Sequence, residues 1–78
     1  MPDDFSFLCA LHNLGATSMD RSLTFEEIRK WTAMEPERVR LNIQKNVEAN
    51  YIQVDPSSGA ERFYLTANGI RKVLSMYS

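Results

Sequence analysis

The sequence predicts an α+β fold in which two short helices, joined by a tight turn, are followed by a β-hairpin and a last helix. Three observations support this prediction. Residues 24–27 form a helix-capping pattern, Pro36 suits the start of a second helix, and two β-rich runs flank Pro56-Ser57-Ser58-Gly59. The 78 residues leave room for one small hydrophobic core, so we expect a single domain over residues 1–78.

The first predicted helix, residues 4–14, is apolar around more than half of its circumference and ends at Gly15. One small core cannot contact all of these side chains, so we expect one face to pack on the domain and another to bind a second copy of the chain. The residues expected at this dimer interface are Phe7, Leu11, Leu14, Met76 and Tyr77. The alternative is that the loop of residues 16–22 folds back over the helix, with Met19 as its plug.

A capping box opens the next helix, because the Thr24 hydroxyl can accept from the Glu27 backbone while the Glu27 carboxylate reaches back to the Thr24 N–H. Phe25 and Ile28 form its buried stripe as far as about residue 33. Pro36 then disfavours helical backbone at the preceding residue but fits the first position of a new helix. A turn of about three residues therefore joins the two helices.

The second helix of the pair is predicted over residues 36–50, with Val39, Ile43 and Val47 as its stripe toward the core. Asn50 can end it because asparagine tolerates the left-handed region. Residues 51–54 and 62–65 are the expected strands.

The last helix is predicted to begin after Thr66, which can cap it, and to run to about residue 77. The residues expected on its apolar face are Ile70, Val73, Leu74 and Tyr77.

A helix pair followed by a hairpin is the plan of a winged helix-turn-helix, whose second helix can enter the major groove of DNA. Three segments carry a more specific resemblance: Leu23-Thr24-Phe25-Glu26-Glu27-Ile28, Asn50-Tyr51-Ile52 and Tyr64-Leu65-Thr66-Ala67-Asn68-Gly69-Ile70. Over residues 22–75 the chain resembles the winged helix-turn-helix domains of small bacterial and archaeal regulators, such as the MarR-like, PadR-like and ArsR-like groups. The resemblance implies a three-helix core, a β-hairpin wing, a C-terminal helix and DNA binding.

Charge gives only weak support to DNA binding. Nine basic residues against ten acidic ones leave a net charge of -1, whereas nucleic-acid binders usually carry a basic excess. The candidate contacts still have suitable chemistry: arginine, glutamine and lysine for base edges or phosphates, and leucine for a thymine methyl group. The predicted DNA-binding residues are Arg38, Arg40, Leu41, Gln44, Lys45 and Arg62.

Cys9 is the only cysteine and His12 the only histidine, which excludes an internal disulfide and a zinc site built on cysteine and histidine. The two could form a nucleophile pair on one helix, but packing on the apolar face of that helix is by far the better explanation. Since no phosphate-binding loop or nucleophile motif appears, we expect a binding module without cofactor, not an enzyme. We find no membrane-spanning run and no signal-like leader, so we expect a cytoplasmic protein.

Two functions from different classes follow. The first is a DNA-binding transcription regulator that acts as a homodimer on two half-sites of double-stranded DNA. The second is a winged-helix module for binding another protein, with Leu41 at the contact. The charged residues around Leu41 are also consistent with an ordinary solvated face. A small-molecule sensor would need a pocket for which the chain has little room except between subunits.

Overall fold

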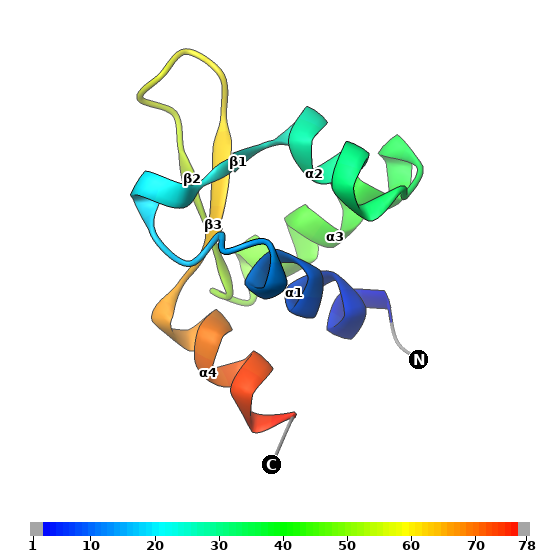
Figure 1. The fold of residues 1–78 in the computed structure, drawn as a ribbon, viewed down its shortest axis with the longest axis vertical. Coiled ribbons are helices and arrows are strands. Elements are labelled where there is room, and N and C mark those ends of the chain that lie inside the picture. Colours follow the sequence, from blue (N-terminus) through cyan, green and yellow to red (C-terminus); the bar gives the residue numbers. More distant parts are fainter. Residues whose placement is uncertain (1–2, 77–78) are drawn as a thin grey trace.

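The computed structural model describes residues 3–76 and confirms the predicted α+β fold (Figure 1). Its helices and strands, in chain order, are α1 (Asp3–Asn13), the 3-10 helix η1 (Met19–Arg21), β1 (Leu23–Thr24), α2 (Phe25–Thr32), α3 (Pro36–Glu48), β2 (Ile52–Asp55), β3 (Arg62–Leu65) and α4 (Ala67–Ser75). The helix pair α2 and α3 is followed by the hairpin β2–β3, as in a winged helix-turn-helix.

The sheet is antiparallel, with β3 between β1 and β2. Leu23 pairs with Phe63 on one side, and Ile52 pairs with Leu65 on the other. The turn of the hairpin extends beyond the sheet at the top of Figure 1. Strand β1 was not predicted, because two residues are too few to show the alternation of a strand.

Helix α1 lies in the middle of the fold and packs against α2, α3, α4 and β3 (Figure 1). Phe7 and Leu11 are therefore core residues, and Leu11 is 0% exposed. Their prediction as a free dimer face is wrong, because four neighbouring elements cover the broad apolar surface of α1. Leu14 and Met76 are partly buried, and Tyr77 lies outside the described residues.

The alternative for this face is also only partly right. The loop after α1 does pack on the domain, since Ala16 is buried and its carbonyl accepts a hydrogen bond from the Leu65 backbone N–H at 2.8 Å. Met19, however, is 55% exposed and plugs nothing. The core is closed by the surrounding helices and sheet.

Helix α3 turns a different face to the core from the one predicted. Its buried residues are Val39, Asn42, Ile43 and Asn46. Val47 is exposed, so that part of the predicted stripe is wrong. The asparagine amides are accommodated because Asn42 Nδ2 donates to the Arg38 carbonyl at 2.8 Å and Asn46 Nδ2 to the Asn42 carbonyl at 2.7 Å. Each buried amide thus finds a partner on its own helix.

The local signals at helix ends are confirmed. Thr24 and Glu27 form the capping box of α2, and the Thr66 hydroxyl accepts from the Gly69 backbone N–H at 3.0 Å. Asn50 has a φ of 66°, in the left-handed region, where α3 gives way to the first hairpin strand. The predicted apolar face of α4 is correct at Ile70 and Val73, which pack on or in the core. Leu74 is wrong, because it is 52% exposed.

Candidate nucleic-acid interface

The outer face of α3 carries five of the six predicted contact residues. At 3.6 residues per turn, Glu37, Leu41, Gln44 and Glu48 follow one line down its centre. Arg38 and Lys45 lie on one side of this line, and Arg40 lies on the other. All of these side chains are exposed, and Leu41 is 58% exposed. The face therefore presents a central line without basic residues between two basic edges.

Ion pairing restrains one of these edges. Arg40 Nη1 lies 2.8 Å from Glu37 Oε1, and the Arg40 guanidinium lies over the Phe25 ring, 5.5 Å from its centroid. Both partners of the ion pair are exposed to solvent, so the pair is weak. Another anion can therefore replace the Glu37 carboxylate at Arg40. Arg40 is thus oriented along the face while it stays available.

Arg62 has partners within the chain that the sequence did not indicate. Its Nε donates to Ser22 Oγ at 3.1 Å and its Nη2 to the Ser22 carbonyl at 2.6 Å. Nη2 also lies 3.9 Å from Glu27 Oε1. The guanidinium therefore joins β3 to the residue before β1 and to the first turn of α2, and two of its five N–H groups donate to Ser22.

Two carboxyl groups beside Arg62 favour the ionised form. Hydrogen bonding from the Thr24 backbone is the main cause that lowers the pKa of Glu27, and the charge of Arg62 adds a smaller effect. Asp55 lies opposite Arg62 in the hairpin register. Its pKa is lowered mainly by hydrogen bonding from Ser57, with a smaller contribution from Arg62. Arg62 is thus the cation shared by the start of α2 and the base of the hairpin.

We expect Arg62→Ala to lower the free energy of unfolding by about 2 kcal/mol, because the substitution removes both hydrogen bonds that Arg62 donates to the buried Ser22. Arg62→Lys should recover only part of this loss, since an ammonium cannot reproduce the planar fork. Urea denaturation followed by circular dichroism measures both. Arg21→Ala, at an exposed arginine of η1, is the matched control. Equal stability of Arg62→Ala and this control would contradict the role given to Arg62.

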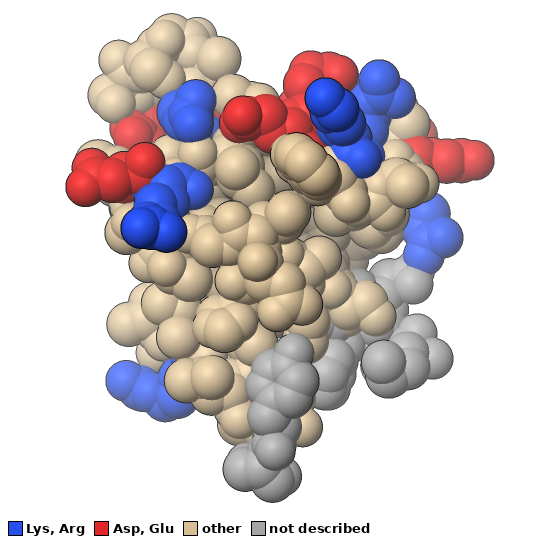
Figure 2. Space-filling model, in the orientation of Figure 1, with Lys and Arg blue, Asp and Glu red and all other residues tan. Residues whose placement is uncertain are grey.

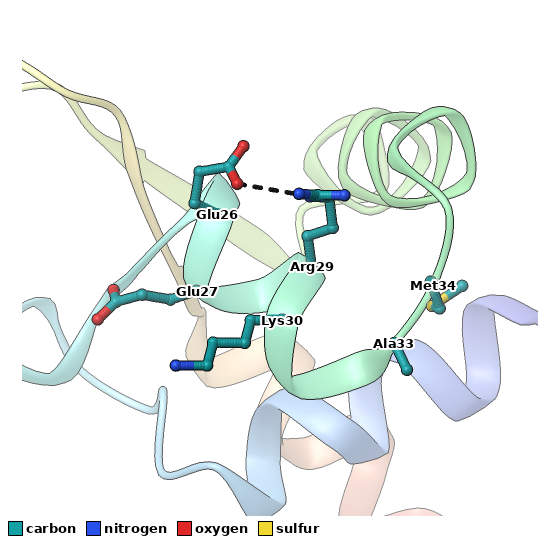
Figure 3. Close-up of a pocket in the computed structure, with 6 residues that line it drawn as sticks. All are labelled: Glu26, Glu27, Arg29, Lys30, Ala33 and Met34. Atoms are coloured by element: carbon teal, nitrogen blue, oxygen red, sulfur yellow. Dashed lines mark hydrogen bonds and ion pairs between the residues drawn. The ribbon is translucent and has the colours of Figure 1, made fainter.

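Helix α2 has a separate hollow of about 490 Å³ on its exposed side (Figure 3). The residues lining it are Glu26, Glu27, Arg29, Lys30, Ala33 and Met34. Arg29 Nε lies 3.4 Å from Glu26 Oε1, and Lys30 Nζ lies 5.9 Å from the centroid of the Trp31 ring. Because two carboxylates accompany the two cations, this hollow has no charge preference that would favour an anion.

Figure 2 shows the same mixture on a larger scale. Acidic and basic side chains alternate over α2 and near the hairpin, while the tan surface at the centre of this view shows no charged side chain. No group of three or more potential metal ligands occurs among residues 3–76. Within the same residues, no helix has the length and apolar character needed to cross a membrane.

The structure brings together Arg38, Arg40, Leu41, Gln44 and Lys45, as predicted from the period of the helix. It places Arg62 apart from them, in the link between β3 and α2. Sequence reasoning missed this link, because Ser22 and Arg62 are 40 residues apart and nothing local indicates that they meet.

Two solved structures are similar to this chain. The DNA-binding TubR fragment from Clostridium botulinum has a TM-score of 0.80 and 27% sequence identity, over 94% of this chain and 91% of the fragment. BpsR from Bordetella bronchiseptica, described with a mechanism for regulation of its DNA binding by 6-hydroxynicotinic acid, has a TM-score of 0.79 and 25% identity. That match covers 99% of this chain and 53% of BpsR, so the chain spans about half the length of that protein.

No protein-family model and no curated protein sequence matches the chain. The two structural neighbours are both DNA-binding proteins, and the chain shares their fold from α1 to α4.

Proposed function

We propose that this chain is a DNA-binding transcription regulator whose helix α3 enters the major groove while the hairpin β2–β3 rests on the flanking backbone. The observation that carries the proposal is the outer face of α3, which is exposed to solvent in a fold that two DNA-binding proteins share. A helix of this size fits the major groove, and the outward side chains include types that contact base edges and phosphates.

The arrangement of α3 gives each residue a role. On a helix lying in a groove, the central line faces the bases and the edges face the two phosphate backbones. Gln44 can pair with adenine, and Leu41 can contact a thymine methyl group. Arg38 and Lys45 would then contact one backbone and Arg40 the other. Arg62 has no direct contact in this proposal and acts by holding the hairpin against α2.

We propose further that the regulator acts as a homodimer on two half-sites. A chain with a net charge of -1 offers few phosphate contacts. When two copies are joined in a dimer, the binding of one copy to DNA raises the effective concentration of the other at its half-site. Phe7 and Leu11 take no part in this proposed dimer, because both are buried in the core.

The test is fluorescence anisotropy of a labelled duplex of about 30 base pairs, titrated at about 50 and 200 mM salt, because phosphate contacts give binding a steep salt dependence. We expect affinity to fall at least about tenfold between these conditions. Arg38→Ala and Lys45→Ala should each reduce the slope of log affinity against log salt by about 0.9. Arg21→Ala, on the exposed η1, is the charge-matched control and should leave the slope unchanged.

Leu41 favours one other function, the binding of a protein partner. It is 58% exposed at the centre of α3, where an apolar side chain suits a protein interface. If the wild-type protein binds no duplex even at low salt, the DNA-binding proposal is wrong, and a partner docking on Leu41 becomes the leading hypothesis. Leu41→Ala would then weaken the protein complex more than Arg38→Ala does.

A further inference from the structure

A second hollow lies where the end of α3 meets α4 and has a volume of about 470 Å³. The residues lining it are Ala49, Tyr51, Asn68, Arg71, Lys72 and Ser75. The lining includes two cations, an amide and a phenol, but no carboxylate. Arg71 and Lys72 are exposed, and they are the only charged residues in α4. This hollow therefore differs from that on α2, where charges of both signs meet.

Among the described side chains, none compensates the positive charge of this hollow. Elsewhere, Arg29 pairs with Glu26 and Arg40 with Glu37. Within residues 3–76, neither Arg71 nor Lys72 makes an ion pair. Two adjacent cations on a protein of net charge -1 repel each other and leave a local excess of positive potential. An anion placed between them would relieve that repulsion.

The walls of the hollow are held in place by the backbone beneath them. Thr66 Oγ1 donates to the Asn50 carbonyl at 2.6 Å, and the Thr66 N–H donates to the Tyr51 carbonyl at 3.0 Å. Gly69, in the first turn of α4, approaches the Tyr51 carbonyl so closely that a β-carbon would collide with it. The start of α4 is thus fixed against residues 50–51, and a ligand need not order these elements in order to bind.

We propose that the hollow between α3 and α4 binds a phosphate group. The Arg71 guanidinium can donate two parallel hydrogen bonds to phosphate oxygens, and the Lys72 ammonium adds a second positive charge. The Asn68 amide and the Tyr51 hydroxyl can donate as well. The phosphate belongs either to a phosphorylated small molecule or to a nucleic-acid backbone, and both present the same oxygens. The site does not depend on the reading of DNA by α3.

The first experiment is isothermal titration of the full chain with sodium pyrophosphate, with sodium chloride of equal ionic strength as the blank. Chemical shifts of backbone amides, followed in parallel, locate the contact. We expect the double variant Arg71→Ala/Lys72→Ala to bind at least about tenfold more weakly, since charge-assisted hydrogen bonds are lost. Arg21→Ala removes an exposed arginine elsewhere and should bind as the wild type does. The far-ultraviolet circular dichroism spectrum checks that each variant is folded.

Two outcomes of this titration would overturn the proposal. The first is a wild-type protein that does not bind pyrophosphate, and the second is equal binding by the wild type and the double variant. Shifts confined to α2 and α3, away from Tyr51 and residues 67–75, would overturn it in the same way.

The salt dependence of duplex binding identifies the source of the phosphate. If the double variant lowers the salt slope by about 0.9 for each lost contact, nucleic acid supplies it. If the slope is unchanged while pyrophosphate binding is lost, a phosphorylated small molecule supplies it. A wild-type protein that binds pyrophosphate but no duplex would refute the DNA-binding function and leave the phosphate site standing.

Discussion

Replacing Leu11 with Ala is expected to lower the free energy of unfolding by about 3 kcal/mol, because it opens a cavity in the core. Leu11 is fully buried on the helix that packs against α2, α3, α4 and β3. Leu74→Ala makes the same chemical change at an exposed site of α4 and should alter stability by no more than about 0.5 kcal/mol. Urea denaturation of both variants measures the difference.

This comparison also separates a core role from an interface role. If Leu11 stabilised a dimer instead, the variant would dissociate at concentrations where the wild type stays associated, and sedimentation would show it. We expect Leu11→Ala to leave the state of association unchanged. A small loss of stability together with dissociation would contradict the placement of Leu11 in the core.

Replacing Gly69 with Ala is expected to destabilise the protein by about 3 kcal/mol through overpacking against backbone. The new β-carbon would collide with the Tyr51 carbonyl, which cannot move freely because it accepts from the Thr66 N–H at 3.0 Å. In an unobstructed helix the same substitution would instead stabilise by up to about 1 kcal/mol, since alanine is the better helix former. The sign of the effect therefore tests the close approach of α4 to residue 51.

Thermal unfolding followed by circular dichroism is a sufficient measurement for Gly69→Ala. Asn68→Ala, at the adjacent exposed position, is the matched control and should be close to neutral in stability. A Gly69→Ala variant as stable as the wild type would mean that α4 does not rest directly on the Tyr51 carbonyl.

The features that were predictable from sequence are those that depend on a few neighbouring residues. The capping box at Thr24 depends on Glu27 alone, and the start of α3 on Pro36. Asn50 can end the helical segment because asparagine readily adopts the left-handed backbone conformation. Such signals are complete within one turn, so tertiary structure did not change them.

The errors arose where burial depends on distant segments. The apolar circumference of α1 indicated a surplus face, because the sequence does not show that four elements surround the helix. The core-facing stripe of α3 was predicted at Val47 instead of Asn46, whose amide donates to the Asn42 carbonyl and can therefore be buried. The candidate contact residues on α3 stay exposed despite this change of register, because they lie opposite the core under either interpretation. The link between Arg62 and Ser22 could not be predicted, since the two residues are distant in sequence.

The central place of α1 has a consequence for how the protein acquires its structure. Helices α2 and α3 rest on α1, but α1 in turn packs against β3 and α4, which come last in the described sequence. Contacts between segments so far apart slow folding, because the loop between them must close first. On the ribosome, helix α3 would therefore emerge before its support is complete. We expect it to become rigid only once residues 62–73 have been synthesised and have docked.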